Sequence, residues 1–154
     1  MVIVFGIKRK KNIALFVDGP NIIRKEFGID LDEFRRLLEK HGRIIIGKVF
    51  LNQYASEKLI EAIANQGFEP AIFLAGEKES DVDVALAVSV VKAAYNEKVD
   101  TIAIASRDSD YLPAIQVAKE RGKKVIVIGI NPGFSKALQN AADAVEILTG
   151  NKKK

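Results

Sequence analysis

The stretch that decides the fold is Ile13-Ala14-Leu15-Phe16-Val17-Asp18-Gly19-Pro20-Asn21. Its first five residues are all apolar, which is typical of a strand buried on both faces of a sheet. The strand ends at Asp18, because Gly19 and Pro20 favour a turn. Four more apolar strands are predicted at 44–51, 70–75, 101–105 and 124–130, with a short final strand at 145–148.

Helical periodicity fills the segments between these strands. Helices are predicted at 32–40, 56–66, 80–96 and 111–121, and a short one from 135. Strands that alternate with helices indicate an α/β fold, with three layers, a mostly parallel central sheet and helices on both faces. Five phenylalanines at periodic positions are predicted to lie in the core, namely Phe27, Phe34, Phe50, Phe68 and Phe73. Three tyrosines are expected to be partly exposed, although packing is the favoured role of the last: Tyr54, Tyr95 and Tyr111.

Length and composition exclude several classes of protein. The 154 residues, 48% hydrophobic and 29% charged, suit one globular domain. The absence of Cys excludes disulfide scaffolds and thiolate zinc sites, and a single His, His41, excludes multi-histidine metal sites. No apolar run approaches the roughly 20 residues that span a bilayer. We therefore expect a cytoplasmic protein that does not contact a membrane.

The positive charge is concentrated at the two ends. The net charge of +4 comes from 24 Lys and Arg against 20 Asp and Glu. Seven basic residues lie in the runs Lys8–Lys11 and Lys152–Lys154, which leaves 17 basic and 20 acidic residues, a net of −3, elsewhere. A slightly acidic body argues against a broad basic surface for nucleic acid. The runs are either solubilising ends or tails that hold a polyanion, and we divide the chain into a basic extension (1–11), one domain (12–149) and a basic tail (150–154).

Carboxylates follow three of the predicted strands. Asp18 ends the first strand, Asp81 and Asp83 follow the third strand at the start of the long helix, and Asp108 and Asp110 follow the fourth strand. Open parallel sheets bind ligands beyond the carboxyl ends of their strands, so we expect these side chains to lie close together.

A divalent cation would relieve the repulsion among these carboxylates. Oxygen ligands suit a hard ion such as Mg²⁺ or Mn²⁺, which neutralises a phosphodiester and lowers the pKa of a bound water. The pattern therefore predicts metal-dependent phosphodiester hydrolysis. Each acid also has an ordinary structural role, Asp18 in a turn and the others at helix N-termini. Only the joint pattern favours a shared site.

Three motifs resemble the NYN domain family, which is PIN-like and includes the LabA-like prokaryotic proteins. They are Leu15-Phe16-Val17-Asp18-Gly19-Pro20-Asn21, then Val82-Asp83-Val84-Ala85-Leu86-Ala87, then Ser106-Arg107-Asp108-Ser109-Asp110-Tyr111. The likeness extends over about residues 12–149. It implies a PIN-like fold with sheet order 3-2-1-4-5, which would put the first and third motifs side by side, and a Mg²⁺- or Mn²⁺-dependent ribonuclease that acts on RNA.

The resemblance also implies roles for individual residues. By position, the catalytic carboxylates that ligate or surround the metal would be Asp18, Asp83, Asp108 and Asp110, with Asp81 close by. Asn21 would orient Asp18 or the substrate phosphate, and Ser106 would support the Asp108 loop. Flanking phosphates would contact basic side chains, and the candidates are Arg24, Lys25, Lys78 and Arg107.

The chain departs from the family pattern at three positions. Many relatives have Gly in place of Arg107 and an acid in place of Ser89, and Asp81 also stands at a usual Gly. The loss of an acid at Ser89 weakens a second metal position. Arg107 would either bind the scissile phosphate or pair with Asp81 or Asp83.

The leading hypothesis is therefore a single-domain endoribonuclease. The first alternative is a non-catalytic RNA-binding or regulatory module that keeps the fold. The second alternative is a metal-dependent phosphohydrolase of small phosphoesters. A homodimer is left open.

Overall fold

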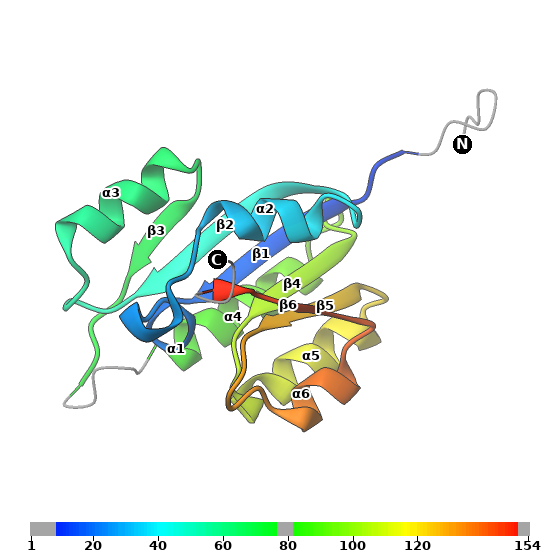
Figure 1. Ribbon diagram of the computed structural model, residues 1–154. Coiled ribbons are helices and arrows are strands. Elements are labelled where there is room, and N and C mark those ends of the chain that lie inside the picture. The colour runs from blue at the N-terminus through cyan, green and yellow to red at the C-terminus, as the bar shows by residue number, and fades with distance from the viewer. Residues whose placement is uncertain (1–8, 77–81, 151–154) are drawn as a thin grey trace.

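A computed structural model describes residues 9–76 and 82–150 and has a six-stranded parallel sheet with helices on both faces (Figure 1). The strand order is β3-β2-β1-β4-β5-β6. The strands are β1 (Asn12–Asp18), β2 (Arg43–Leu51), β3 (Glu69–Ile72), β4 (Thr101–Ala105), β5 (Lys124–Gly129) and β6 (Ala144–Ile147). The α-helices are α1 (Gly19–Ile22), α2 (Asp32–Leu38), α3 (Glu57–Asn65), α4 (Asp83–Ala94), α5 (Leu112–Glu120) and α6 (Lys136–Ala141). Two 3-10 turns are η1 (Lys25–Phe27) and η2 (Ser109–Tyr111).

The sheet confirms the predicted fold class and extends the expected order by one strand. Every neighbouring pair is parallel, so the sheet that was predicted to be mostly parallel is entirely so. The additional strand is β6, which pairs with β5 at one edge. Its four residues include three of the four that the sequence predicted at 145–148.

The apolar run in β1 is continuous because helices cover both of its faces. Ala14 and Phe16 belong to a core shared with α4, α5 and α6. Ile13, Leu15 and Val17 belong to a second core, shared with α2 and α3. Successive side chains of a strand point to opposite faces, so a strand between two cores needs apolar residues at every position.

The chain order reverses between β1 and β4, at the centre of the sheet. From β1 the chain builds outward through β2 and β3, and it then returns to build β4, β5 and β6 on the other side. The loops that follow β1 and β4 therefore leave the sheet side by side at its carboxyl edge. In open α/β sheets this switch point is where ligands bind.

One prediction about a core side chain is wrong, and one predicted helix ends early. Phe73 was expected in the core, but it is 42% exposed, because edge strand β3 ends at Ile72 and Phe73 only stacks on Phe50 at a centroid distance of 5.7 Å. The helix that was predicted to run to Lys40, α2, ends at Leu38, and His41 Nε2 beyond it lies 2.7 Å from Glu146 Oε2. Phe27, Phe34, Phe50 and Phe68 are buried as predicted.

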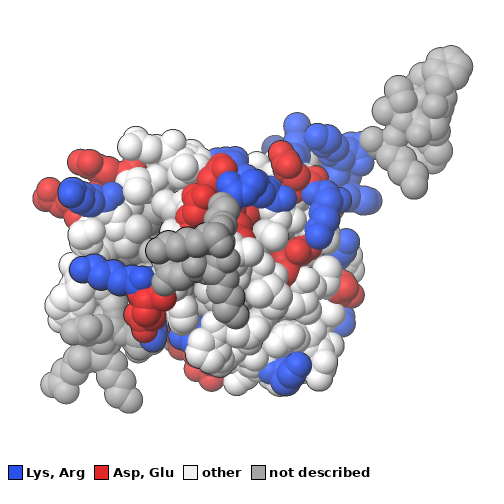
Figure 2. Space-filling model, in the orientation of Figure 1, with Lys and Arg blue, Asp and Glu red and all other residues white. Residues whose placement is uncertain are grey.

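Charged side chains of both signs are interspersed on the face that Figure 2 shows, without a single broad basic surface. The part of the N-terminal basic run that the structure describes, Arg9 to Lys11, precedes β1 and so lies at the opposite end of that strand from Asp18. Arg9 pairs there with Asp100 at 3.1 Å. Among the described residues, the helices are too short or too polar to cross a membrane.

The start of α1 requires a glycine. A Cβ on Gly19 would collide with the backbone oxygen of Phe50 and would lie 2.7 Å from Leu51 Cδ2. We expect Gly19→Ala to lower the free energy of unfolding by about 1–3 kcal/mol, because the buried loop must shift to admit the methyl group. Urea unfolding measures the change. Gly76→Ala is the control, since a Cβ at Gly76 meets nothing within 4 Å. Equal stability of the two variants would contradict the close approach.

Candidate metal centre

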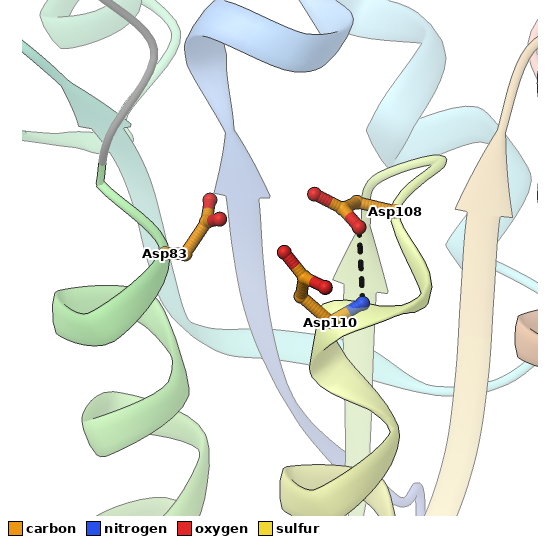
Figure 3. Close-up of side chains that lie close together, drawn as sticks. All are labelled: Asp83, Asp108 and Asp110. Atoms are coloured by element: carbon orange, nitrogen blue, oxygen red, sulfur yellow. Dashed lines mark hydrogen bonds between the residues drawn. The ribbon is translucent and has the colours of Figure 1, made fainter. Parts of the chain in front are cut away.

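Three carboxylates from two segments that are distant in the sequence converge at the carboxyl edge of the sheet. Asp83 begins α4, and Asp108 and Asp110 belong to the loop that follows β4 and to η2. One oxygen of each lies within 4.8 Å of an oxygen of the other two (Figure 3). Asp83 and Asp108 are half-buried and Asp110 is exposed. We call these three residues the acidic cluster.

The loop after β4 is held by hydrogen bonds between side chains and backbone. The Ser106 hydroxyl accepts from the Asp108 amide at 3.1 Å, and Asp108 Oδ1 accepts from the Asp110 amide at 3.0 Å. Asp108 therefore caps η2 and also presents its carboxylate to the cluster. Asp83 lies in the first turn of α4, where the helix dipole favours a negative charge. These structural roles do not prevent the three carboxylates from facing one another.

Asp18 lies behind the acidic cluster and is not one of its three members. It is 2% exposed, and its Oδ2 accepts from the Tyr111 hydroxyl at 3.0 Å and from the Ser106 hydroxyl at 3.3 Å. Its Oδ1 is buried and has no hydrogen-bond partner. The pKa of Asp18 is raised from 3.8 to about 6, chiefly by burial and also by the charge of Asp83, while hydrogen bonds from Tyr111, the Asn21 backbone and Ser106 oppose the rise.

Tyr111 connects Asp18 to the acidic cluster. Its hydroxyl oxygen lies 3.0 Å from Asp18 Oδ2 and 3.1 Å from Asp83 Oδ1. The side chain is fully buried, which confirms the favoured packing role and excludes the partial exposure that was also considered. Burial and the two carboxylates raise the pKa of Tyr111, so that the hydroxyl keeps its proton. The Tyr111 hydroxyl has one proton and can donate fully to only one of the two carboxylates. With a proton on Asp18, Asp18 would donate to the Tyr111 oxygen and Tyr111 would donate to Asp83.

Asn21 and Ser106 join the loops that follow β1 and β4. Asn21 Oδ1 accepts from the Arg107 amide at 2.8 Å and lies 3.4 Å from the Ser106 hydroxyl. The Asn21 side chain therefore holds the start of the loop that carries Asp108, and its backbone faces the Asp18 carboxylate.

Arg107 points away from the acidic cluster. Its guanidinium carbon lies 4.8 Å from the centre of the Phe27 ring, and its Nη1 donates to the Pro132 carbonyl at 2.8 Å. The structure therefore does not form the pair with Asp83 that the sequence left open. The other predicted partner, Asp81, lies outside the described residues, as does Lys78.

The remaining candidates lie farther from the cluster. Arg24 is exposed, donates from Nε to the Pro20 carbonyl at 2.9 Å and lies 3.9 Å from Glu26. Lys25 is exposed in η1. Ser89 is two turns along α4 from Asp83 and borders a different cavity, together with Lys48 and Lys92.

Comparisons with known proteins identify the family of the chain and a solved structure that shares its fold. The family profile described as NYN domain matches residues 12–149. The uncharacterized protein MJ0482 of Methanocaldococcus jannaschii is 59% identical over 138 residues, which make up 90% of this chain and 55% of that protein. The chain thus spans about half the length of this curated relative. A protein of unknown function from Vibrio parahaemolyticus, VPA0982, has a crystal structure with a TM-score of 0.79, at 21% identity over 92% of this chain and 94% of that one, and shares the fold.

The buried charge of Asp18 should make stability depend on pH. Its folded pKa of about 6 lies above the ordinary value of 3.8, so its contribution to stability is present below pH 4 and is lost as the pH rises through about 6. Asp18→Asn removes this loss. In EDTA, we expect the stability of the variant relative to wild type to increase between about pH 4 and pH 7 by up to about 3 kcal/mol, measured by urea unfolding. A difference that is the same at both pH values would contradict the raised pKa.

The Tyr111 hydroxyl should lower the pKa of Asp18. Tyr111→Phe keeps the buried ring but removes the hydrogen bond, so we expect the midpoint of the Asp18 carboxyl titration to move above about 6. Carboxyl ¹³C NMR in EDTA measures this midpoint. Tyr95→Phe is the matched control, because Tyr95 is 61% exposed and lies at the opposite end of α4 from Asp83. An Asp18 midpoint that does not move in Tyr111→Phe would show that the contact has no electrostatic effect.

Proposed function

This protein belongs to the NYN domain family, and we propose that it is a Mg²⁺- or Mn²⁺-dependent endoribonuclease that hydrolyses RNA phosphodiesters at the acidic cluster. The observation that carries the proposal is the convergence of Asp83, Asp108 and Asp110, whose oxygens lie within 4.8 Å of one another. Local capping explains each acid alone, but it does not require α4 and the β4 loop to bring their carboxylates together.

The donor set suits a hard divalent cation. All three members of the acidic cluster offer carboxylate oxygens, the ligands that Mg²⁺ and Mn²⁺ prefer. The buried Oδ1 of Asp18, which lacks a hydrogen-bond partner, adds negative potential behind the cluster. When bound there, the cation would neutralise the phosphodiester charge and lower the pKa of the attacking water.

The residues around the cluster have distinct roles in this proposal. Asp83, Asp108 and Asp110 hold the cation, and Asp18 contributes charge from behind them. Tyr111 is a positioning residue, since its hydroxyl fixes Asp18 relative to Asp83.

The substrate side of the proposal rests on basic residues at the same edge. Arg24, Lys25 and Arg107 follow β1 and β4, where their charges can position an RNA backbone without reading its sequence. The slightly acidic body leaves most of the affinity at this edge to these few contacts.

The decisive variants remove one carboxylate charge from the cluster. We expect Asp83→Asn and Asp108→Asn each to reduce Mn²⁺-dependent cleavage of a single-stranded RNA by roughly 100-fold or more, because a lost ligand charge removes several kcal/mol of transition-state stabilisation. Gel-based cleavage assays in Mn²⁺ and in EDTA measure the effect. Glu120→Gln is the control, since it removes an exposed carboxylate at the end of α5.

Two outcomes would reject the ribonuclease. RNA that is bound but left intact by wild type in Mn²⁺ would favour the RNA-binding module. Cleavage of a small chromogenic phosphodiester that excess RNA does not inhibit would favour the phosphohydrolase.

A further inference from the structure

A cavity of about 520 Å³ lies beside the acidic cluster, and no role assigned above uses it. Its lining comes from segments that follow β1, β4 and β5 and from the end of β6, so it opens at the same carboxyl edge. Its volume is within the range of pockets that bind small organic molecules.

One part of the wall is apolar and firmly held. Phe27, Ile130 and Leu148 belong to the core on the α2 and α3 face, and each is less than 10% exposed. Ile147 in β6 is 43% exposed and lies at the rim. Such a wall provides a preformed surface for a flat, apolar group.

The other part of the wall carries two guanidinium groups. Arg24 and Arg107 both line the cavity, together with Glu26, whose carboxylate lies 3.9 Å from Arg24 Nη1. The Arg107 guanidinium is fixed between the Phe27 ring and the Pro132 carbonyl. Two guanidinium groups beside one carboxylate leave a net positive charge on this wall, which favours an anion.

Arg107 also connects this cavity to the acidic cluster. It lines a second, shallower hollow of about 380 Å³, which it shares with Asn21, Asp108 and Gly133. Asp108 is a member of the cluster. The Arg107 side chain therefore lies between the larger cavity and the hollow that Asp108 borders.

We propose that the larger cavity binds one nucleotide of the RNA strand, with its base against Phe27, Ile130 and Leu148 and its phosphate on Arg24 and Arg107. The assignment rests on the proposed function, because RNA cleavage at the neighbouring cluster is what would bring a phosphodiester strand to this cavity. An apolar wall and paired guanidinium groups match the two halves of a nucleotide, since bases bind to apolar, aromatic and Arg surfaces and guanidinium groups bind phosphate. The cavity would thus anchor the strand one or more nucleotides away from the bond that is cut.

The test measures RNA binding without cleavage. The probe is a short fluorescein-labelled single-stranded oligoribonucleotide in EDTA, followed by fluorescence anisotropy. Ile147→Trp fills the cavity from its rim, and Arg24→Gln removes one charge. We expect each variant to bind the probe roughly tenfold more weakly than wild type, the scale of one lost base or phosphate contact. Val145→Trp is the matched control, because Val145 is exposed on the same strand but does not line the cavity.

The outcomes separate this inference from the proposed function. Wild-type affinity in Ile147→Trp would overturn the cavity assignment, even if Arg24→Gln binds weakly, because only phosphate would then be recognised. Displacement of the probe by polyglutamate as readily as by unlabelled RNA would also overturn it, in favour of an acidic peptide. Weak binding by both variants of a protein that cuts no RNA in Mn²⁺ would support the cavity and reject the ribonuclease.

Discussion

A carboxylate buried at the end of the central strand is the constraint that orders the rest of this edge of the sheet. Asp18 ends β1, which has neighbours on both sides and helices on both faces, and it is therefore almost completely removed from water. Tyr111 reaches it from the segment that follows β4, and the same hydroxyl reaches Asp83 at the start of α4. Three segments that are distant in the sequence are thereby held in one arrangement. The charge that this arrangement buries is costly in the absence of a cation, and this cost gives the cluster its affinity for a cation in the proposed function.

The loop after β4 links the acidic cluster to the substrate side. Asp108 faces Asp83 and Asp110, whereas Arg107, the residue before it, points to Phe27 and Pro132 on the other side of the loop. Asn21 fixes the backbone between these two directions. In the proposed enzyme, this loop would set the distance between the metal and the nucleotide cavity, so that binding and cleavage depend on one short segment.

The sequence predicts the parts of the site that depend on local pattern, and it fails where distant contacts decide. The apolar run before Asp18 and the acids that follow β4 were sufficient to predict the fold class and the edge that carries the carboxylates. Tyr111 was assigned to packing because a tyrosine after Asp110 gives no local sign of its two buried partners. Arg107 was expected to face phosphate or acid. Its contacts with Phe27 and Pro132 could not be predicted, because they depend on how the η1 and β5 loops meet. A charge that follows a strand can be predicted from the sequence, but the direction of a side chain in a loop cannot.

A crystal structure of the protein soaked in Mn²⁺, with anomalous diffraction recorded at the manganese edge, tests the central claim most directly. If the acidic cluster holds the cation, we expect an anomalous peak among the carboxylate oxygens of Asp83, Asp108 and Asp110, and no such peak in crystals of Asp108→Asn. A wild-type crystal whose acidic cluster shows no peak at millimolar Mn²⁺, or whose peak persists unchanged in the variant, would contradict it.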